Sequence, residues 1–302
     1  MNLEERFLGC LIGLAVGDAL GGPIEEIPGK PKPTAKRPLT EMIGGGPFNL
    51  KPGEYTDDAS MALALAKTII TCKGYHPIHV AREYAKWERT LPSATGRTIQ
   101  ESMRRIRAGI PWDKASDNPY GNNYAGTGAA MRCAPIALLN HSRPEKLIEH
   151  TRKDAIITHR HPDCISSSIF INTFIAALLR ADDPLIAKNY ALRHINDNPA
   201  LQKRYETLEH AGKPTKGVYD IVENSVHTLL TTTTFEEALT KSVNLAGDAD
   251  TRGAVTGAIA GAHYGEKAIP LRWKQALVDH LGTPAYERIK RLAHDLYRTA
   301  NT

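Results

Sequence analysis

Hydrophobic residues recur at helical spacing along most of this chain, and no stretch shows the sustained alternation of a half-buried strand. In residues 57–72, Met61, Leu65 and Ile69 fall on one face of a helix capped by Thr56. Residues 163–180 are strongly apolar, which indicates a helix buried in the core. The same reasoning predicts further helices over residues 3–20, 77–91, 98–108, 128–140, 144–157, 184–196, 199–211, 217–231, 235–246, 252–264, 271–280 and 284–299. We therefore expect an all-α fold, a single orthogonal multi-helix domain that spans residues 1–302.

Two of the predicted helices carry a stripe of glycine at every fourth position. The first stripe is Gly9, Gly13, Gly17 and Gly21, and the second is Gly253, Gly257, Gly261 and Gly265. Each glycine costs a helix about 1 kcal/mol relative to alanine, so a repeated glycine needs a compensating reason. A glycine stripe lets another backbone approach closely. We expect these two helices to cross at short distance in the centre of the molecule, against each other or each against a neighbour.

Two short acidic motifs lie far apart in the sequence, each at the start of a predicted helix. They are Thr56-Asp57-Asp58 and Asp248-Ala249-Asp250-Thr251. Either motif alone is more typical of a helix cap than of a metal site. However, in an extended loop Asp248 and Asp250 would lie on one side of the backbone. Asp57 and Asp58 would point about 100° apart on a helix, so that each could reach a different ion. Together the motifs supply hard oxygen ligands for two divalent cations in a central cleft.

A glycine-rich turn at residues 126–129 leads into another predicted helix. The backbone N–H groups of such a turn can hold a phosphate, and a plain glycine turn has the same sequence. The stretch before it, residues 111–126, is irregular and contains Tyr120 and Tyr124. His159 and His161 lie between two helices, with no cysteine or further histidine at zinc spacing. They suggest a structural or ligand-contacting pair.

Composition and charge argue against several classes of protein. The 302 residues carry a net charge of +5 with 24% charged residues, and no basic block marks a nucleic-acid or membrane partner. The separated cysteines, Cys10, Cys72, Cys133 and Cys164, are typical of reduced thiols. The N-terminus lacks the basic start of a signal peptide, and the apolar run 7–16 is too short to span a bilayer. We expect a cytoplasmic monomer.

The motifs occur together in the order and spacing of a known family. They are G-D-A-L-G at residues 17–21 with Glu25, T-D-D at 56–58, G-T-G-A-A-M-R at 126–132, T-H at 158–159 and G-D-A-D-T at 247–251. In these motifs the chain resembles the ADP-ribosylglycohydrolase family, the group of dinitrogenase-reductase-activating glycohydrolase and the ADP-ribosyl-acceptor hydrolases. The resemblance covers nearly the whole chain, and the two acidic motifs are specific as a pair.

The resemblance implies an all-helical fold with two Mg²⁺ or Mn²⁺ ions. Carried over by motif, the metal ligands are Thr56, Asp57, Asp58, Asp248, Asp250 and Thr251. Glu25, Asp57 and Asp250 would be the catalytic residues, with Glu25 beside the metals and the substrate. The loop Gly126, Thr127, Gly128 and Ala129 would hold the diphosphate of ADP-ribose. His159 would contact the ADP-ribose, and Tyr120 or Tyr124 would stack on its adenine.

The activity that the resemblance implies is hydrolysis of the N- or O-glycosidic bond between ADP-ribose and an acceptor. The substrate would be an ADP-ribosylated protein or a small ADP-ribosyl conjugate. Two alternatives stay open: a two-metal hydrolase of phosphoesters or nucleotides, and a catalytically silent ADP-ribose-binding protein. The four intact aspartates of the acidic motifs argue against the silent protein.

Two positions depart from the family pattern. The family commonly has Asn where Thr127 stands, and its arginine-directed members carry an acid at the position that aligns with Ala94. A carboxylate there would pair with a guanidinium, and Arg97 would repel a cationic acceptor if it points inward. Glu25, Glu26 or the long loop 27–54 is the alternative source of the missing charge. We expect weaker processing of arginine-linked ADP-ribose than of a neutral or oxygen-linked conjugate.

Overall fold

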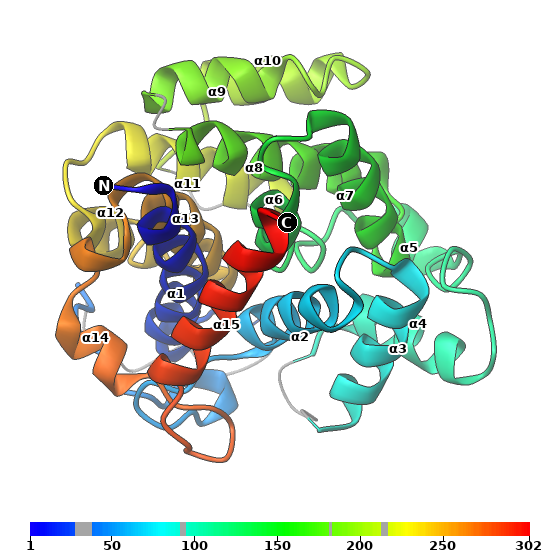
Figure 1. Ribbon diagram of the computed structural model, residues 1–302, viewed down its shortest axis with the longest axis horizontal. Coiled ribbons are helices and arrows are strands. Elements are labelled where there is room, and N and C mark those ends of the chain that lie inside the picture. Colours follow the sequence, from blue (N-terminus) through cyan, green and yellow to red (C-terminus); the bar gives the residue numbers. More distant parts are fainter. Residues whose placement is uncertain (28–37, 91–94, 181–182, 213–216) are drawn as a thin grey trace.

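Helices α1 (Leu3–Gly21) and α13 (Ala249–Tyr264) lie side by side in the middle of the fold and run antiparallel (Figure 1). Their glycine stripes face each other, with Gly9 against Gly261, Gly13 against Gly257 and Gly17 against Gly253. A Cβ added at Gly13 would come within 2.2 Å of the Gly257 carbonyl oxygen, so only glycine permits this approach. The predicted close contact is confirmed, in a register that pairs Gly21 with Ala249 and leaves Gly265 against Met1.

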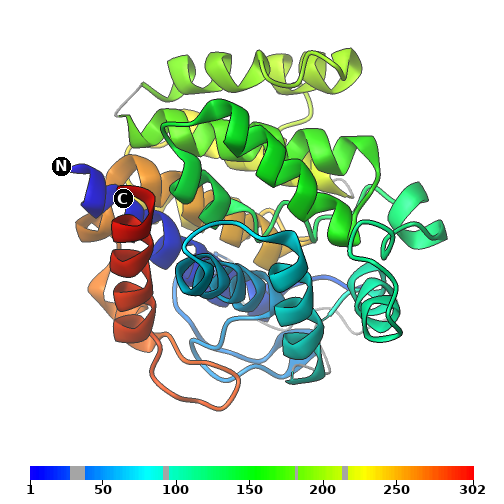
Figure 2. The ribbon, with the colours of Figure 1, turned by 45° about the vertical axis from the view of Figure 1, so that its right-hand side comes forward.

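The remaining helices enclose this pair in layers (Figures 1 and 2). Helices α2 (Asp57–Cys72), α3 (Pro77–Trp87) and α4 (Arg97–Arg107) follow one another on one side, and α15 (Tyr286–Ala300) packs across α1 and α2. The opposite side holds α6 (Ala134–Asn140), α7 (Pro144–Thr158), α8 (Pro162–Leu179), α9 (Pro184–Leu192) and α10 (Pro199–Thr207). Helices α11 (Val218–Leu230) and α12 (Phe235–Val243) pack on α13, and α5 (Pro119–Asn123) and α14 (Leu271–Ala276) are short. Single 3₁₀ turns are η1 (Gly22–Ile24), η2 (Gly46–Phe48), η3 (Glu88–Thr90) and η4 (Glu266–Ala268).

The computed structural model describes residues 1–27, 38–90, 95–180, 183–212 and 217–302. Within these ranges there are helices and three isolated β-bridges and no strand, which confirms the all-α prediction. Helix α2 has the predicted bounds, and α8 is buried along almost its whole length, as its apolar sequence requires. All four cysteines are free thiols.

Three local predictions are wrong. Residues 128–132 form turns, and the helix predicted from residue 128 begins only at Ala134. The segment 111–126 contains the short helix α5, because Asn118 Oδ1 accepts hydrogen bonds from the Tyr120 and Gly121 N–H groups. Helix α13 begins at Ala249 and not at residue 252, so Asp248 is its N-cap residue and Asp250 and Thr251 lie in its first turn.

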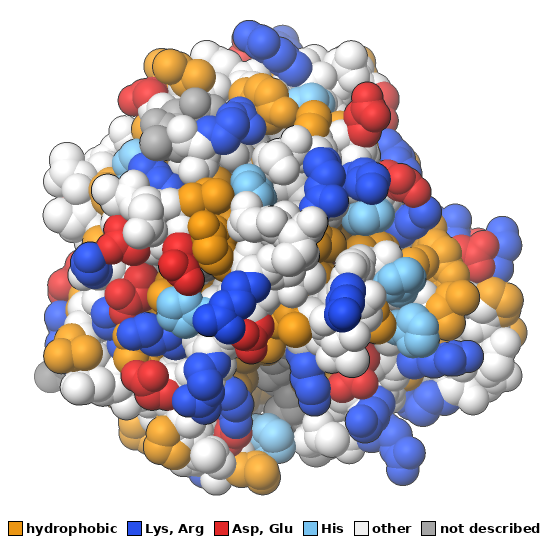
Figure 3. Space-filling view, in the orientation of Figure 1, with side chains coloured by type: hydrophobic (Ala, Val, Ile, Leu, Met, Phe, Trp, Pro, Cys, Tyr) orange, Lys and Arg blue, Asp and Glu red, His pale blue; other side chains and the backbone are white. Residues whose placement is uncertain are grey.

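Surface charge and helix length are two features that matter for binding to nucleic acids or membranes. On the face shown in Figure 3, Lys and Arg side chains lie among Asp, Glu and His side chains. Two helical segments, Leu3–Ile24 and Pro162–Leu179, are long and apolar enough to cross a bilayer by length and composition. The first is longer than the apolar run noted in the sequence. Both are almost wholly buried among other helices, as core helices are.

Candidate active site

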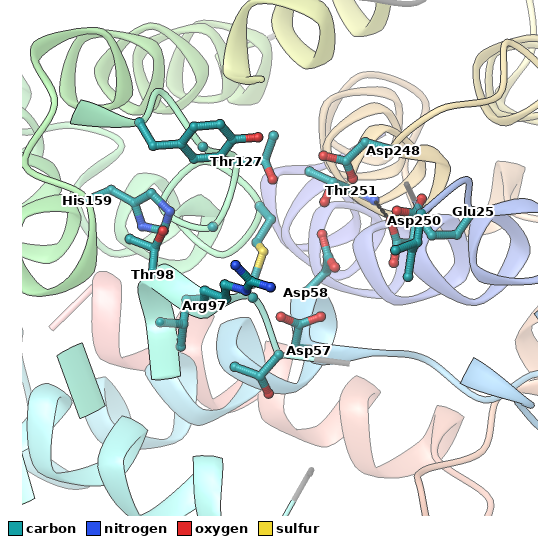
Figure 4. Close-up of a pocket in the computed structure, with 18 of the residues that line it drawn as sticks. Glu25, Asp57, Asp58, Arg97, Thr98, Thr127, His159, Asp248, Asp250 and Thr251 are labelled. Carbon is teal, nitrogen blue, oxygen red and sulfur yellow. Dashed lines mark hydrogen bonds between the residues drawn. The ribbon is translucent and has the colours of Figure 1, made fainter. Parts of the chain in front are cut away.

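A cavity of about 760 Å³ lies where α1 ends and α13 begins, within the size range of small-molecule sites. Its walls come from distant parts of the chain. The polar, glycine and tyrosine residues that line it are Glu25, Asp57, Asp58, Thr95, Gly96, Arg97, Thr98, Tyr120, Tyr124, Gly126, Thr127, Gly128, His159, Asp248, Asp250 and Thr251. Figure 4 shows the carboxylates gathered on one side and His159 on the opposite side, with Arg97 between them.

Glu25 meets the second acidic motif because α1 and α13 are antiparallel. The chain leaves α1 through η1 and reaches the start of α13, where Glu25 Oε2 accepts a hydrogen bond from the Ala249 N–H at 2.8 Å. The next residue, Glu26, donates its N–H to the Gly247 carbonyl at 2.9 Å. One carboxylate oxygen from each of Glu25, Asp248 and Asp250 lies within 4.8 Å of the other two. These three acids form a continuous acidic surface at the end of the central helix pair.

Asp248 and Asp250 converge through the start of a helix, so the expected extended loop is wrong. Asp248 is the N-cap residue of α13, and Asp250 lies in its first turn. Ala246 and Gly247 both have positive φ, 70° and 69°, and turn the chain sharply into the helix. The buried Arg252 guanidinium holds this turn: it donates to the Ala246 carbonyl at 2.6 Å and to Asp220 of α11 at 2.6 Å.

Asp18, a buried residue of α1, holds the start of α2 through hydrogen bonds. Its carboxylate accepts hydrogen bonds from the Thr56 N–H at 2.9 Å and from the Ala59 N–H at 2.8 Å. A side chain of another helix thus does what an N-cap residue usually does. Thr56 occupies the N-cap position, but its hydroxyl lies 2.8 Å from Asp18 Oδ1 and 3.1 Å from Asp58 Oδ2. The first turn of α2, with Asp57 and Asp58, is thereby fixed against α1.

Burial and mutual repulsion raise the pKa values of these acids. Burial, and then the charge of Asp248, raises the pKa of Glu25 to about 8. Burial, and then the charge of Asp18, raises the pKa of Asp57 to about 8. The pKa values of Asp58 and Asp250 are raised well above the usual range, with burial as the first cause. Positive charge placed among these carboxylates would relieve the repulsion.

The residues present fit a divalent cation. The acidic side of the cavity offers carboxylate and hydroxyl oxygens, the donors that Mg²⁺, Mn²⁺ and Ca²⁺ prefer. Asp58 Oδ1 is buried and makes no hydrogen bond within the described part of the chain, as a ligand atom facing a metal position would be. Among the described residues that line the cavity, Arg97 is the single Lys or Arg, so the chain itself supplies little balancing charge.

The opposite wall is built from the glycine-rich turn and His159. A Cβ added at Gly128 would lie 2.7 Å from His159 Cε1, and one at Gly126 would lie 3.0 Å from His159 Nε2. Glycine at these two positions therefore lets the backbone pass close to the imidazole ring. Tyr120 and Tyr124 line the same cavity and are 48% and 57% exposed, so their rings are accessible to a planar ligand.

The structure brings most of the predicted site residues to this one cavity. Thr56 and Ala129 do not line it, because the Thr56 hydroxyl is bonded to Asp18 and Ala129 is fully buried. Arg97, on whose direction the expected acceptor preference depends, points into the cavity (Figure 4). Ala94, the other residue behind that expectation, lies outside the described residues.

The sequence patterns indicate no role for Asp18, Arg132 or Arg252, although all three lie in or beside the motifs. Each is buried, with 0% of its side chain exposed. The available signal was a charged residue within an apolar or glycine-rich segment, since a buried charge requires specific partners. Those partners, including Asp154 and Asp220, are far away in the sequence and show no pattern of their own.

The fold and the cavity together define an all-helical protein with an acidic cluster that could bind a metal ion, opposite a glycine-rich wall. Over residues 1–302 the chain matches the ADP-ribosylglycohydrolase family, and it belongs to that family. The resemblance inferred from the motifs is confirmed.

Similarity to individual proteins extends over nearly the whole chain. The chain is 31% identical over 276 residues to the ADP-ribosyl-(dinitrogen reductase) glycohydrolase of Rhodospirillum rubrum, covering 91% of each chain. It is 30% identical over 315 residues to the ADP-ribosylarginine hydrolase Tri1 of Serratia proteamaculans, covering 98% of this chain and 80% of that one. A solved structure of an ADP-ribosylglycohydrolase-related protein complex matches with a TM-score of 0.82 at 33% identity, covering 99% of both chains.

Proposed function

We propose that this chain hydrolyses the glycosidic bond between ADP-ribose and an acceptor, and that it does so with two divalent cations, Mg²⁺ or Mn²⁺. The observation that carries the proposal is the convergence of two distant acidic motifs on one cavity, opposite a glycine-rich wall, in a member of this family. The proposed ligands are Asp57, Asp58, Asp248, Asp250 and Thr251. Four carboxylates suit two divalent ions in charge, and their oxygens suit them in type.

The glycine-rich wall is the proposed binding surface for the diphosphate of ADP-ribose. Thr127 and the two glycines beside it bring backbone close to the ligand, and His159 adds a ring nitrogen. Tyr120 and Tyr124, exposed on the same cavity, are placed to stack on the adenine ring. With the diphosphate on this wall, the ribose lies toward the carboxylates.

The acidic wall is the proposed reaction centre. When bound, the cations orient the ribose hydroxyls and lower the pKa of a water molecule. Glu25 is held by the Ala249 N–H through Oε2, and its carboxylate is the proposed group that takes up or releases a proton at the anomeric carbon. Buried carboxylates also stabilise the positive charge that develops on the ribose ring as the bond breaks.

Metal removal tests the proposal directly. We expect excess chelator to abolish release of ADP-ribose from a conjugate, and Mg²⁺ or Mn²⁺ to restore it. Asp57→Asn and Asp250→Asn should lower kcat by about a hundredfold or more and should reduce metal occupancy together with turnover. Asp295→Asn, at an exposed acid of α15, is the matched control. Full activity in excess chelator would contradict the metal-dependent mechanism.

Product analysis separates this activity from the two alternatives. A glycosidic-bond hydrolase releases free ADP-ribose. A phosphoester or nucleotide hydrolase releases phosphate or AMP, and a silent binding protein shows affinity for ADP-ribose without turnover.

Two observations bear on which acceptor is linked to the ADP-ribose, and they point in opposite directions. The names of two bacterial relatives specify ADP-ribosylarginine, and this favours an arginine-linked substrate. Arg97, however, is exposed and points into the cavity, where its positive charge would repel the guanidinium of an arginine acceptor. We therefore propose that neutral or oxygen-linked conjugates are processed better than arginine-linked ones.

A further inference from the structure

A buried ion pair lies behind the glycine-rich wall. The Arg132 guanidinium and the Asp154 carboxylate are 0% and 1% exposed, and Arg132 Nε donates to Asp154 Oδ2 at 3.0 Å. A second donor nitrogen of Arg132, Nη2, bonds the Asp154 carbonyl at 2.9 Å. The Tyr84 hydroxyl donates to the other carboxylate oxygen of Asp154 at 3.0 Å. These contacts leave Arg132 a single orientation in the fold.

The remaining nitrogen of Arg132 points at the cavity wall. Arg132 Nη1 donates to the Gly128 carbonyl at 2.7 Å and to the Thr158 hydroxyl oxygen at 2.9 Å. Thr158 is fully buried at the end of α7, and its hydroxyl oxygen lies 2.8 Å from Nδ1 of His159. The ion pair is therefore connected through Thr158 to the imidazole ring that lines the cavity.

The position of each proton follows from the chemistry of the groups. A guanidinium only donates, so Thr158 accepts from Arg132 with one lone pair. The hydroxyl hydrogen of Thr158 then has His159 Nδ1 as its partner, and Nδ1 accepts. Were Nδ1 protonated instead, the buried hydroxyl hydrogen would lose this partner, which is unfavourable. Burial, and then the charge of Arg132, also lowers the pKa of His159 to about 3, so the ring stays neutral. A neutral imidazole whose Nδ1 accepts carries its proton on Nε2.

Nε2 is the side of the ring that the ligand would meet. His159 lines the cavity, and within the described part of the chain no residue makes a hydrogen bond to Nε2. Glycine at 126 keeps the space beside Nε2 free of a side chain, since a Cβ there would lie 3.0 Å from this nitrogen. The ring therefore presents an N–H group without a full charge.

We infer that Thr158, held by Arg132, fixes His159 as the Nε2–H tautomer and so makes it a hydrogen-bond donor to an anionic oxygen of the ligand. Thr158 and Arg132 are then positioning residues for His159. The identity of that oxygen, a diphosphate oxygen of ADP-ribose, rests on the proposed function. The position of the proton does not, because it follows from contacts within the chain.

The tautomer is measured in the ligand-free protein by NMR of ¹⁵N-histidine-labelled chain. The protein has 12 histidines, and His159→Gln identifies the signals of His159 by their loss. We expect a protonated nitrogen that couples to both ring C–H protons, which identifies Nε2–H, and an unprotonated Nδ1. A protonated Nδ1 or a doubly protonated ring at pH 7 in the wild type would overturn the inference.

Thr158→Val and Thr158→Ser form the matched pair, since valine keeps the shape and loses the hydroxyl, whereas serine keeps the hydroxyl. We expect Thr158→Val to shift His159 toward the other tautomer and to weaken ADP-ribose binding about tenfold. Thr158→Ser should retain the wild-type tautomer and bind within about threefold of the wild type. An unchanged tautomer in Thr158→Val would contradict the role of Thr158. Failure of the wild type to bind ADP-ribose would instead contradict the proposed function, while the ligand-free spectrum still decides the tautomer.

Discussion

Asp18 illustrates how one buried carboxylate can fix a site that it does not itself line. Its two oxygens accept hydrogen bonds from three donors at the start of α2, the N–H and the hydroxyl of Thr56 and the N–H of Ala59, and burial raises its pKa to about 7. The aspartates of the first acidic motif keep their direction only while this turn is held. Asp18 therefore acts on the proposed metal ligands through the backbone that carries them.

Replacing Asp18 by asparagine should weaken both stability and metal binding. The amide has one acceptor oxygen, so its NH₂ group would face backbone donors, and we expect a loss of about 1–3 kcal/mol in the free energy of unfolding. Urea denaturation and titration with Mn²⁺ measure the two effects. The control is Asp295→Asn on the exposed face of α15, which should change neither. A fully stable Asp18→Asn protein with normal metal affinity would show that Asp18 is not the cap of α2.

Arg97 provides a test of acceptor preference. We expect Arg97→Gln to raise the ratio of kcat/KM for arginine-linked over serine-linked ADP-ribose by about fivefold, because one repulsive charge of about 1 kcal/mol is removed. Arg97→Lys keeps the charge and should keep the wild-type ratio. The proposal is wrong if the wild type already prefers the arginine conjugate by a wide margin, or if both variants leave the ratio unchanged.

At the scale of elements, the central contact between α1 and α13 depends on glycine. The added Cβ of Gly13→Ala would meet the Gly257 carbonyl at 2.2 Å, and that of Gly257→Ala would meet the Gly13 carbonyl at 1.9 Å. We expect either change to lower the free energy of unfolding by about 1–3 kcal/mol or more, despite the better helix propensity of alanine. Thermal unfolding measures this. Gly96→Ala, where an added Cβ meets nothing within 4 Å, should cost about 1 kcal/mol or less.

The elements also show what can be predicted from sequence and what cannot. The period of Met61, Leu65 and Ile69 is local information, and it places α2 correctly. Residues 128–133 are different, because the Gly128 carbonyl, which a helix would bond to the N–H of residue 132, accepts from the Arg132 side chain instead. That side chain is held by Asp154, and no local pattern reveals such a partner.

In the candidate site, too, local motifs could be predicted from the sequence, whereas contacts between distant residues could not. The two acidic motifs were recognisable because each is a short run of ligand-type residues at a helix start. The hydrogen bond between Asp18 and Thr56 joins residues 38 apart in the sequence, and the one from Arg132 to Thr158 joins residues 26 apart. Each therefore exists only in the folded chain. The register of the glycine stripes was equally beyond the sequence, since equal spacing permits several offsets.

At the scale of the whole molecule, the acidic cavity should make stability depend on pH. Glu25 and Asp57 have pKa values raised to about 8, above the values near 4 of an unfolded chain. The folded protein then binds more protons than the unfolded chain between about pH 4 and pH 8, so stability falls as pH rises through this window. Buried histidines such as His159, with lowered pKa, act in the opposite direction below about pH 6.5.

We therefore expect the metal-free protein to lose thermal stability from pH 6.5 to pH 8, where the carboxylates dominate. Mg²⁺ or Mn²⁺ should raise Tm, and the increase should be larger at pH 8 because fewer protons compete for the ligands. Asp57→Asn should be more stable than the wild type at pH 8 without metal and should gain less from added metal. A metal-free Tm that is flat over this range, with no gain from either cation, would contradict this account of the cavity.

The antiparallel pairing of α1 with α13 has a consequence for how the protein is made. Helix α1 ends at Gly21, whereas its central partner begins only at Ala249. At translation rates of 5–20 residues per second, α1 waits roughly 10–50 s before α13 has been synthesised. During that time an apolar, glycine-striped helix has no partner along the face that α13 will cover, which makes it a natural binding segment for chaperones on the nascent chain. A product truncated before residue 249 lacks both the central helix pair and the second acidic motif, so stability and activity would be lost together.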